Sequence, residues 1–424
     1  MTASRTQSGT SISHPRLACS ALMLAIAFRL IFGLNSLAQA QTFTVLHKLS
    51  RAGDGATPRA GVIRDAKGNL YGTTFDGGAF YYGAVFKVQA NDTETVLHSF
   101  TGGDGLWPAA GLMRDAEGNL YGTTTMGGTS EGGMCTYGCG TVFKLDTRGK
   151  ETVLHAFTWE NGDGALPMAS LVQDGDGSLY GTTSAGGSGC SGYGCGMVFR
   201  ITKSGKWTAF YSFTGGTDGL FPAGGLVLDA TGTLYGATTD GGSPNYGYGT
   251  VYKVDKNGKH TVLYMLNGGS DGSNPFGSLV RDEAGNLYGT ARGGGASGCG
   301  EGCGTVFKVD NTGKFTVLYT FTGGADGGNP ETGLVQDSAD NLYGTTFQGG
   351  DVECANQGSY GCGLVFKLDP KGNYTVLHNF TGGADGVFPN GLLLDSASNL
   401  YGTTPEFGIK QHVIGSGVVF KLTP

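Results

Sequence analysis

Charged side chains are scarce in this sequence, and basic ones are the scarcer kind. Asp, Glu, Lys and Arg make up 14% of the 424 residues, with 34 acidic against 27 basic side chains. Residues 1–40 hold three arginines and no acidic residue, so the remaining chain has 24 basic residues and a formal charge near −10. A surface of this sign repels phosphate backbones, which argues against nucleic acid as a partner.

Helical periodicity is missing, and so is any long apolar run beyond residue 40. The first absence argues against a helical fold, and the second against a membrane span after residue 40. The one apolar stretch, residues 17–37, follows Arg5 and Arg16 and precedes the small residues Ala38 and Ala40. This order predicts a signal peptide over residues 1–40, cleaved before Gln41. An uncleaved N-terminal anchor is the alternative, because Arg29 interrupts the apolar stretch.

Complete catalytic motifs are missing too. Residues 128–132 match G-x-S-x-G and residues 293–298 match G-x-G-x-x-G, but both motifs need a helix that no pattern here supports. There is no H-E-x-x-H and no P-loop. The least repetitive stretch, residues 405–416, contains Glu406, Lys410 and His412 and is interpreted as a drifted surface loop. We therefore assign no catalytic residue and no cofactor.

Glycine, in contrast, is abundant, and its 81 residues mark the turns of a tandem repeat. The stretch G-N-L-Y-G-T-T at residues 118–124 recurs in seven close copies, between about 50 and 60 residues apart. The copies are anchored at Tyr71, Tyr121, Tyr180, Tyr235, Tyr288, Tyr343 and Tyr401. A repeat of this length decides the fold before any single motif does.

Each repeat contains four short strands joined mainly by turns. In the second copy they fall at about residues 111–115, 120–125, 141–146 and 151–157. Seven such units predict an all-β fold, a seven-bladed β-propeller of four-stranded antiparallel blades. Residues 42–49 resemble a fourth strand alone, and residues 391–422 supply three strands without a fourth. The N-terminal strand should therefore close the last blade, in a single domain over residues 41–424.

The fourth strand carries a repeated histidine. His47, His98, His155 and His378 align with Tyr211, Tyr264 and Tyr319. Strict alternation would place His155 on the same face as Val153 and Phe157. Because tyrosine replaces histidine in three copies, we expect a packing role and not a catalytic one.

The loops after strands two and four should share one end of the propeller, where their lengths vary. Cys19 lies in the leader. The other eight cysteines form local pairs within loops between strands two and three: Cys135 and Cys139, Cys190 and Cys195, Cys299 and Cys303, Cys354 and Cys362. Even, local pairing in an exported chain predicts four disulfides. Zinc is the alternative for the C-x3-C spacing, but these loops contain no histidine.

The loops after strand four repeat an Asp-Gly turn. Its aspartates are Asp54, Asp104, Asp163, Asp218, Asp271, Asp326 and Asp385. The simpler interpretation is a turn in which Asp bonds its own backbone. A ring of carboxylates that binds calcium is the alternative. Aromatic residues gather at the same end and form a candidate ligand face: Trp107, Phe221, Phe388, Tyr137, Tyr193 and Tyr360.

The derived consensus, G-L-V-x-D-x-x-G-N-L-Y-G-T-T-x-x-G-G with G-T-V-F-K-L-D and T-V-L-H-x-F-T-G-G-x-D-G, resembles the Gloeo/Verruco ("GloVer") tandem repeat. The resemblance covers about residues 42–422. It implies an exported bacterial repeat protein of a type that often carries C-terminal anchoring segments. Residues 421–424 show no apolar tail, which favours a secreted or periplasmic form. The family implies no established activity or catalytic residues.

Two functions follow from these expectations. The first is a monomeric, non-enzymatic scaffold that binds a protein or a glycan through its Cys-stapled loop face. The second is an extracellular lyase or hydrolase, acting on a polysaccharide or a small ligand at the mouth of the channel. A cluster of unrepeated acid, base and cation at that mouth would favour the enzyme.

Overall fold

The computed structural model describes residues 1–2, 41–51, 53–128, 135–190, 192–243, 247–350, 354, 361–406 and 415–424. The chain divides into two units, Met1–Gln41 and Thr42–Pro424, and the fold below is that of the second. The predicted signal peptide lies almost wholly outside the described residues. In the part of the chain that is described, no helix has the length and apolar character to cross a membrane.

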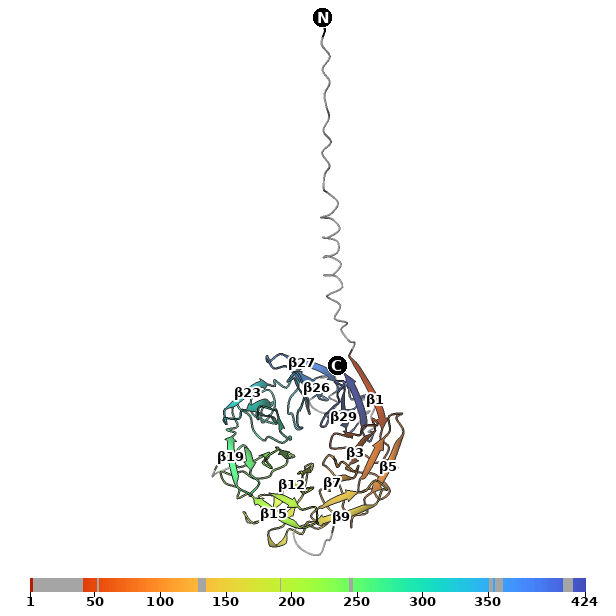
Figure 1. The fold of residues 1–424 in the computed structure, drawn as a ribbon, viewed down its shortest axis with the longest axis vertical. Coiled ribbons are helices and arrows are strands. Elements are labelled where there is room, and N and C mark those ends of the chain that lie inside the picture. Colours follow the sequence, from red (N-terminus) through yellow and green to blue (C-terminus); the bar gives the residue numbers. More distant parts are fainter. Residues whose placement is uncertain are drawn as a thin grey trace. The chain divides into compact units, whose positions relative to one another are not determined.

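Thr42–Pro424 contain seven four-stranded antiparallel sheets arranged in a ring (Figure 1). Blade 1 comprises β2 (Ile63–Arg64), β3 (Leu70–Thr74), β4 (Ala84–Val88) and β5 (Glu94–Ser99); blade 2 comprises β6 (Met113–Arg114), β7 (Leu120–Thr124), β8 (Thr141–Leu145) and β9 (Glu151–Ala156); blade 3 comprises β11 (Val172–Gln173), β12 (Leu179–Thr183), β14 (Met197–Ile201) and β15 (Trp207–Ser212). Blade 4 comprises β16 (Val227–Leu228), β17 (Leu234–Thr238), β18 (Thr250–Val254) and β19 (His260–Met265); blade 5 comprises β20 (Val280–Arg281), β21 (Leu287–Ala291), β22 (Thr305–Val309) and β23 (Phe315–Thr320). Blade 6 comprises β24 (Val335–Gln336), β25 (Leu342–Thr346), β26 (Leu364–Leu368) and β27 (Tyr374–Asn379); blade 7 comprises β28 (Leu393–Leu394), β29 (Leu400–Thr404), β30 (Val418–Thr423) and β1 (Thr42–Lys48). A short pair, β10 (Gly164–Ala165) with β13 (Ala185–Gly186), and the 3-10 turn η1 (Glu160–Gly162) lie in loops.

The N-terminal strand closes the ring. β1 pairs antiparallel with β30, from Thr42 opposite Thr423 to Lys48 opposite Val418. The last sheet therefore has the order β1-β30-β29-β28, with the first and last strands of the fold in one blade. This confirms the predicted seven-bladed propeller and its closure, which leaves no blade with a missing strand.

The G-N-L-Y-G-T-T motif is explained by contacts inside the blade. In blade 2, a Cβ on Gly122 would lie 2.6 Å from the ring of Phe143, so only glycine lets that ring cover the strand. The Tyr121 hydroxyl donates to Asp115 at 3.0 Å, and Asp115 also accepts from the Asn119 backbone at 2.7 Å. The motif thus holds the turn and the core of each blade.

Large aromatic side chains fill the contacts between blades. Phe143 is fully buried and packs edge to face against Phe100, with ring centroids 5.1 Å apart. Phe100 directly follows β5 of blade 1. Six blades have phenylalanine at the position of Phe143, but blade 4 has Tyr252. The Tyr252 hydroxyl is buried and has no hydrogen-bond partner. The blade therefore contains a polar atom that its core does not satisfy.

Tyr252→Phe is expected to raise the free energy of unfolding by about 1–2 kcal/mol, because it removes a buried, unsatisfied hydroxyl. Chemical denaturation would measure the change. The matched control is Tyr235→Phe in the same blade, since the Tyr235 hydroxyl donates to Asp229 at 3.0 Å and its loss should destabilise. Stabilities that fall equally in both variants would contradict the prediction.

A β-bulge in the outer strand overturns the strict alternation expected around His155. Val153 pairs with Phe143 and His155 pairs with Val142, so Leu154 is an extra residue. Because Phe143 and Val142 are adjacent on β8, Val153 and His155 lie on opposite faces of the sheet. The same register shift occurs in all seven blades. Each outer strand thereby presents its first residues to the preceding blade and its His or Tyr to the following one.

Candidate functional site at the channel mouth

The loops after strands two and four meet at one end of the ring, as expected. In blade 2, Leu106 of the incoming loop pairs with Met126 of the loop between β7 and β8. The backbone bonds run both ways, at 2.8 and 3.1 Å. Equivalent bridges occur in the other blades. These loops together form what we call the loop end of the propeller.

A ring of strained residues organises the loop end. In each blade the residue before the proline has a left-handed backbone, with φ between 52° and 60°. These residues are Thr57, Trp107, Leu166, Phe221, Asn274, Asn329 and Phe388. Bulky residues rarely adopt this conformation, so the surrounding bonds must hold it. Trp107, for example, donates its N–H to the Tyr82 carbonyl of blade 1 at 2.9 Å and accepts from Thr125 at 3.1 Å.

All four predicted disulfides are present and support this ring. The paired cysteines have Cα atoms 4.9–5.7 Å apart. The second cysteine of each pair accepts the N–H of a left-handed residue from the next blade: Cys139 from Leu166, Cys195 from Phe221, Cys303 from Asn329 and Cys362 from Phe388. Each bridge closes a short loop, so its main effect is local stiffening of the contact between two blades.

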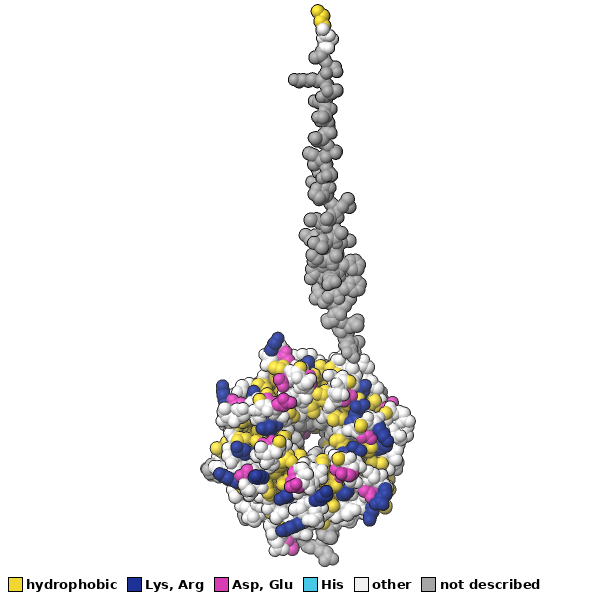
Figure 2. All heavy atoms as spheres, viewed as in Figure 1, with side chains coloured by type: hydrophobic (Ala, Val, Ile, Leu, Met, Phe, Trp, Pro, Cys, Tyr) yellow, Lys and Arg dark blue, Asp and Glu magenta, His cyan; other side chains and the backbone are white. Residues whose placement is uncertain are grey.

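A pocket of about 690 Å³ occupies the channel at the loop end, and one face of the ring is visibly hollowed at its centre (Figure 2). Its rim is formed by the residue that follows the proline of each blade, a position that varies among the repeats. In blade order these are Arg59, Ala109, Met168, Ala223, Phe276, Glu331 and Asn390.

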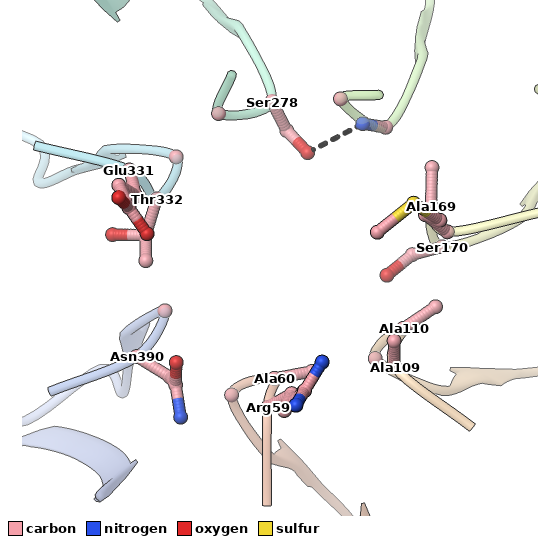
Figure 3. A pocket seen from close by; sticks show the side chains of 18 of the residues that line it. Arg59, Ala60, Ala109, Ala110, Ala169, Ser170, Ser278, Glu331, Thr332 and Asn390 are labelled. Carbon is pink, nitrogen blue, oxygen red and sulfur yellow. Dashed lines mark hydrogen bonds between the residues drawn. The ribbon is translucent and has the colours of Figure 1, made fainter. Parts of the chain in front are cut away.

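The pocket is one-sided (Figure 3). Glu331, Asn390 and Arg59 come from the consecutive blades 6, 7 and 1, and they form a polar sector. The opposite sector, from blades 2 to 5, presents small or apolar side chains at the same position. Ser170 and Ser278 add hydroxyl groups there, and the Ser278 hydroxyl accepts the Gly225 N–H at 2.9 Å. A ligand with one polar edge and one apolar face fits this division.

The two charged groups of the polar sector are held by neighbours. The Arg59 guanidinium lies 3.6 Å above the Phe75 ring, and burial lowers its pKa while nearby Asp76 opposes that shift. Glu331 forms an ion pair with Arg292 at 2.8 Å. Burial raises the pKa of Glu331, and Arg292 partly offsets the effect. Arg59 thus supplies positive charge inside the pocket, whereas Glu331 is already neutralised by its partner.

The predicted aromatic ligand face is only partly brought together. Phe388 lines the pocket and stacks on Phe347 at 4.3 Å. Trp107 stacks on Phe75 at 5.6 Å, and Tyr137 lies 6.4 Å from Trp107. Phe221 and Tyr193 are exposed at the loop end without lining the pocket. Tyr360, Lys410 and His412 lie outside the described residues, but Glu406 lines the pocket.

The seven Asp-Gly aspartates lie one to a blade, and each bonds the His or Tyr of its own outer strand. Asp104 accepts from His98 at 2.9 Å and Asp218 from Tyr211 at 2.8 Å, and the other five bonds span 2.9–3.2 Å. Burial raises the pKa of Asp104, but bonds from His98 and Thr101 outweigh it and leave the pKa lowered. The turn interpretation accounts for these contacts, and calcium binding stays a prediction.

The contact between successive outer strands shows a feature that the sequence reasoning missed. In most outer strands the residue four positions before the strand's own His or Tyr stacks on the His or Tyr of the preceding blade: Phe43 on His378, Trp207 on His155, His260 on Tyr211, Phe315 on Tyr264 and Tyr374 on Tyr319, at 3.9–5.0 Å. Two junctions place a glutamate there instead, Glu94 beside His47 and Glu151 beside His98. Comparing the seven copies at this position would have revealed both.

Glu151 is expected to make stability depend on pH. Burial raises its pKa from 4.5 to about 7, with His98 opposing and Asp104 adding to the shift. The folded state holds the proton more tightly, so the stabilisation is full below pH 4.5 and is lost as pH rises through 7. Because the side chain is only half-buried, solvent screening limits the loss to about 1 kcal/mol.

The measurement is urea unfolding at pH 5 and pH 8 in EDTA, for the wild type and Glu151→Gln. We expect the variant to lose less stability than the wild type between the two pH values. An identical loss in both proteins would contradict the assignment of the titration to Glu151.

The model of the Gloeobacter/Verrucomicrobia repeat family matches residues 30–136, 129–356 and 301–424 of this chain. The chain belongs to this repeat family. The three matched segments overlap and together span all seven blades, and the resemblance seen in the sequence is confirmed. No curated protein sequence matches the chain.

Solved structures are similar to this chain at low sequence identity. The extracellular domain described for a hybrid two-component system of B. thetaiotaomicron is 13% identical with a TM-score of 0.56, covering 90% of this chain and 41% of that one. A gluconolactonase of Xanthomonas campestris is 14% identical with a TM-score of 0.44, covering 91% of this chain and 89% of that one. This chain spans less than half of the first protein's length. Such similarities describe the fold and not the activity.

Proposed function

We propose that this protein is an exported, non-catalytic β-propeller that binds the end of a glycan chain at the channel mouth. The observation that carries the proposal is the one-sided pocket, with Arg59 and Asn390 facing a sector of apolar side chains. A sugar ring has hydroxyl groups at its edge and an apolar face that stacks on aromatic rings, and Phe276 and Phe388 line the pocket.

The size of the pocket favours a chain end over a protein partner. A volume of about 690 Å³ lies in the range of small-ligand sites, which accept one or two sugar units but not a folded surface. The ring of left-handed residues and the four disulfides make the rim stiff, so little ordering cost opposes binding. The disulfides also support export, because such bonds persist in oxidising compartments.

A glycan array probed with the purified protein tests this proposal. We expect bound glycans to share one terminal unit, and the free mono- or disaccharide of that unit to compete. Binding that ignores this competitor, or that follows only the net charge of the glycan, would place recognition away from the pocket and contradict the proposal.

A second candidate function is a glycan-cleaving enzyme, favoured by the unrepeated acid Glu331 and cation Arg59 at the mouth. Mass spectrometry of the bound glycan after incubation distinguishes the two functions. Cleavage that Glu331→Gln abolishes without loss of binding would establish the enzyme. An intact glycan that stays bound would favour the binding protein.

A further inference from the structure

The junction between the last blade and the first contains an unusual group of side chains. His47 lies on β1, Asp54 follows it in the loop, and Glu94 begins β5 of blade 1. One possible ligand atom from each lies within 4.8 Å of the other two. Among the described residues no other set of three His, Cys, Asp or Glu side chains meets this condition.

Hydrogen bonds hold His47 and Asp54 in place, and a metal ion bound by both side chains would replace the bond between them. His47 Nε2 lies 2.9 Å from Asp54 Oδ2, while Asp54 Oδ1 accepts from the Ser50 N–H and hydroxyl at 2.7 Å each. The His47 and Asp54 side chains are largely enclosed, with exposed fractions of 20% and 12%. Glu94 Oε1 is buried and has no hydrogen-bond partner. An enclosed carboxylate oxygen without a partner needs an explanation.

The other blades show what this junction lacks. Five junctions place an aromatic ring where Glu94 lies, stacked on the preceding His or Tyr. The sixth places Glu151 there, and its Oε1 is also buried without a partner, but among the described residues Glu151 does not form a set of three ligand atoms within 4.8 Å of one another. Here two carboxylates and one imidazole come together instead. A bound cation would balance the two carboxylates and satisfy the Glu94 oxygen that has no partner.

We propose that His47, Asp54 and Glu94 bind a divalent transition metal ion of the Zn²⁺ type, which fastens the closure of the ring. One imidazole nitrogen with two carboxylate oxygens is a donor set for Zn²⁺ and related ions, whereas Ca²⁺ prefers oxygen ligands alone. Because His47 belongs to the strand that closes blade 7 and Glu94 to blade 1, the ion joins the chain's first strand to the blade that follows it.

The test is Zn²⁺ binding to tag-free, chelator-stripped protein at pH 7.5, measured by calorimetry and by metal content after dialysis. We expect one tight equivalent per chain and a rise in the thermal midpoint on addition of Zn²⁺. Glu94→Gln should weaken the affinity at least about tenfold, because it removes one ligand. Glu151→Gln, the same change at the next junction, should leave it unaltered.

His47→Tyr supplies a second variant that keeps the fold. Tyrosine stands at the equivalent position in blade 3, where the Tyr211 hydroxyl donates to Asp218 at 2.8 Å. A tyrosine at position 47 should therefore keep the bond to Asp54 while the imidazole is lost. This variant should fold and fail to bind Zn²⁺ tightly. The proposal is overturned if the stripped wild type binds no Zn²⁺, or if Glu94→Gln and His47→Tyr bind it as tightly as the wild type does.

Discussion

Replacing Arg59 with methionine is expected to weaken glycan binding at the channel mouth by about 10- to 100-fold. A hydrogen bond to a charged group contributes about 1.5–3 kcal/mol, and about 1.4 kcal/mol corresponds to a tenfold change in affinity. Methionine keeps the length and apolar stem of the side chain, so the pocket retains its shape. Titration calorimetry with the competing saccharide from the array measures the effect.

Arg51→Met is the matched control for that experiment. The substitution removes the same charge at a residue close in sequence to Arg59. The Arg51 side chain is 71% exposed and forms a long ion pair of 3.9 Å with Asp76. It should bind like the wild type. If Arg51→Met and Arg59→Met weaken binding equally, the effect is one of net charge, and the pocket is not the binding site. If neither weakens binding, the proposed role of Arg59 is wrong.

Gly140→Ala is expected to lower the free energy of unfolding by about 2–5 kcal/mol. Gly140 precedes β8 with φ of +102°, which costs an alanine about 1–2 kcal/mol. A Cβ would also lie 2.4 Å from the Thr124 carbonyl oxygen and 2.6 Å from Pro167 of the next blade. Overpacking of this kind adds about 1–3 kcal/mol, because backbone and proline cannot move independently.

Gly372→Ala separates these two contributions. Gly372 has φ of +86° but open space where its Cβ would stand, so only the backbone cost of about 1–2 kcal/mol applies. Denaturant unfolding of both variants gives the difference. Equal destabilisation would show that the junction between blades relaxes around the added methyl group, and that glycine is needed there only for its conformation.

Much of the architecture was predictable because every blade carries its own copy of the residues that form its turns and core. The G-N-L-Y-G-T-T motif combines the Asp115–Tyr121 turn with the bare backbone that Phe143 covers, and these contacts are local in the chain. The half-repeats at the two ends predicted the pairing of β1 with β30. The disulfides were predictable for the same reason, since each cysteine pair lies within one loop.

The candidate site was less predictable, because its members belong to different repeats. Arg59, Glu331 and Asn390 stand at one repeat position and look like scattered substitutions in the sequence. The predicted aromatic face lies at the same end of the propeller as the pocket, yet only Phe388 among its described members lines it. The charge and polarity of the pocket arise from which blades are neighbours in the ring.

By itself, the sequence determined the number of blades, the closing strand and the loops that disulfides staple, since these depend on short-range patterns repeated seven times. Only the tertiary structure decided which way His155 faces, because one extra residue at Leu154 reverses the alternation that the pattern implies. It also decided that Glu94 meets His47 and that Arg59 shares a pocket with Asn390. The half-repeats predict ring closure, but these side chains belong to different blades and meet only once the ring has formed.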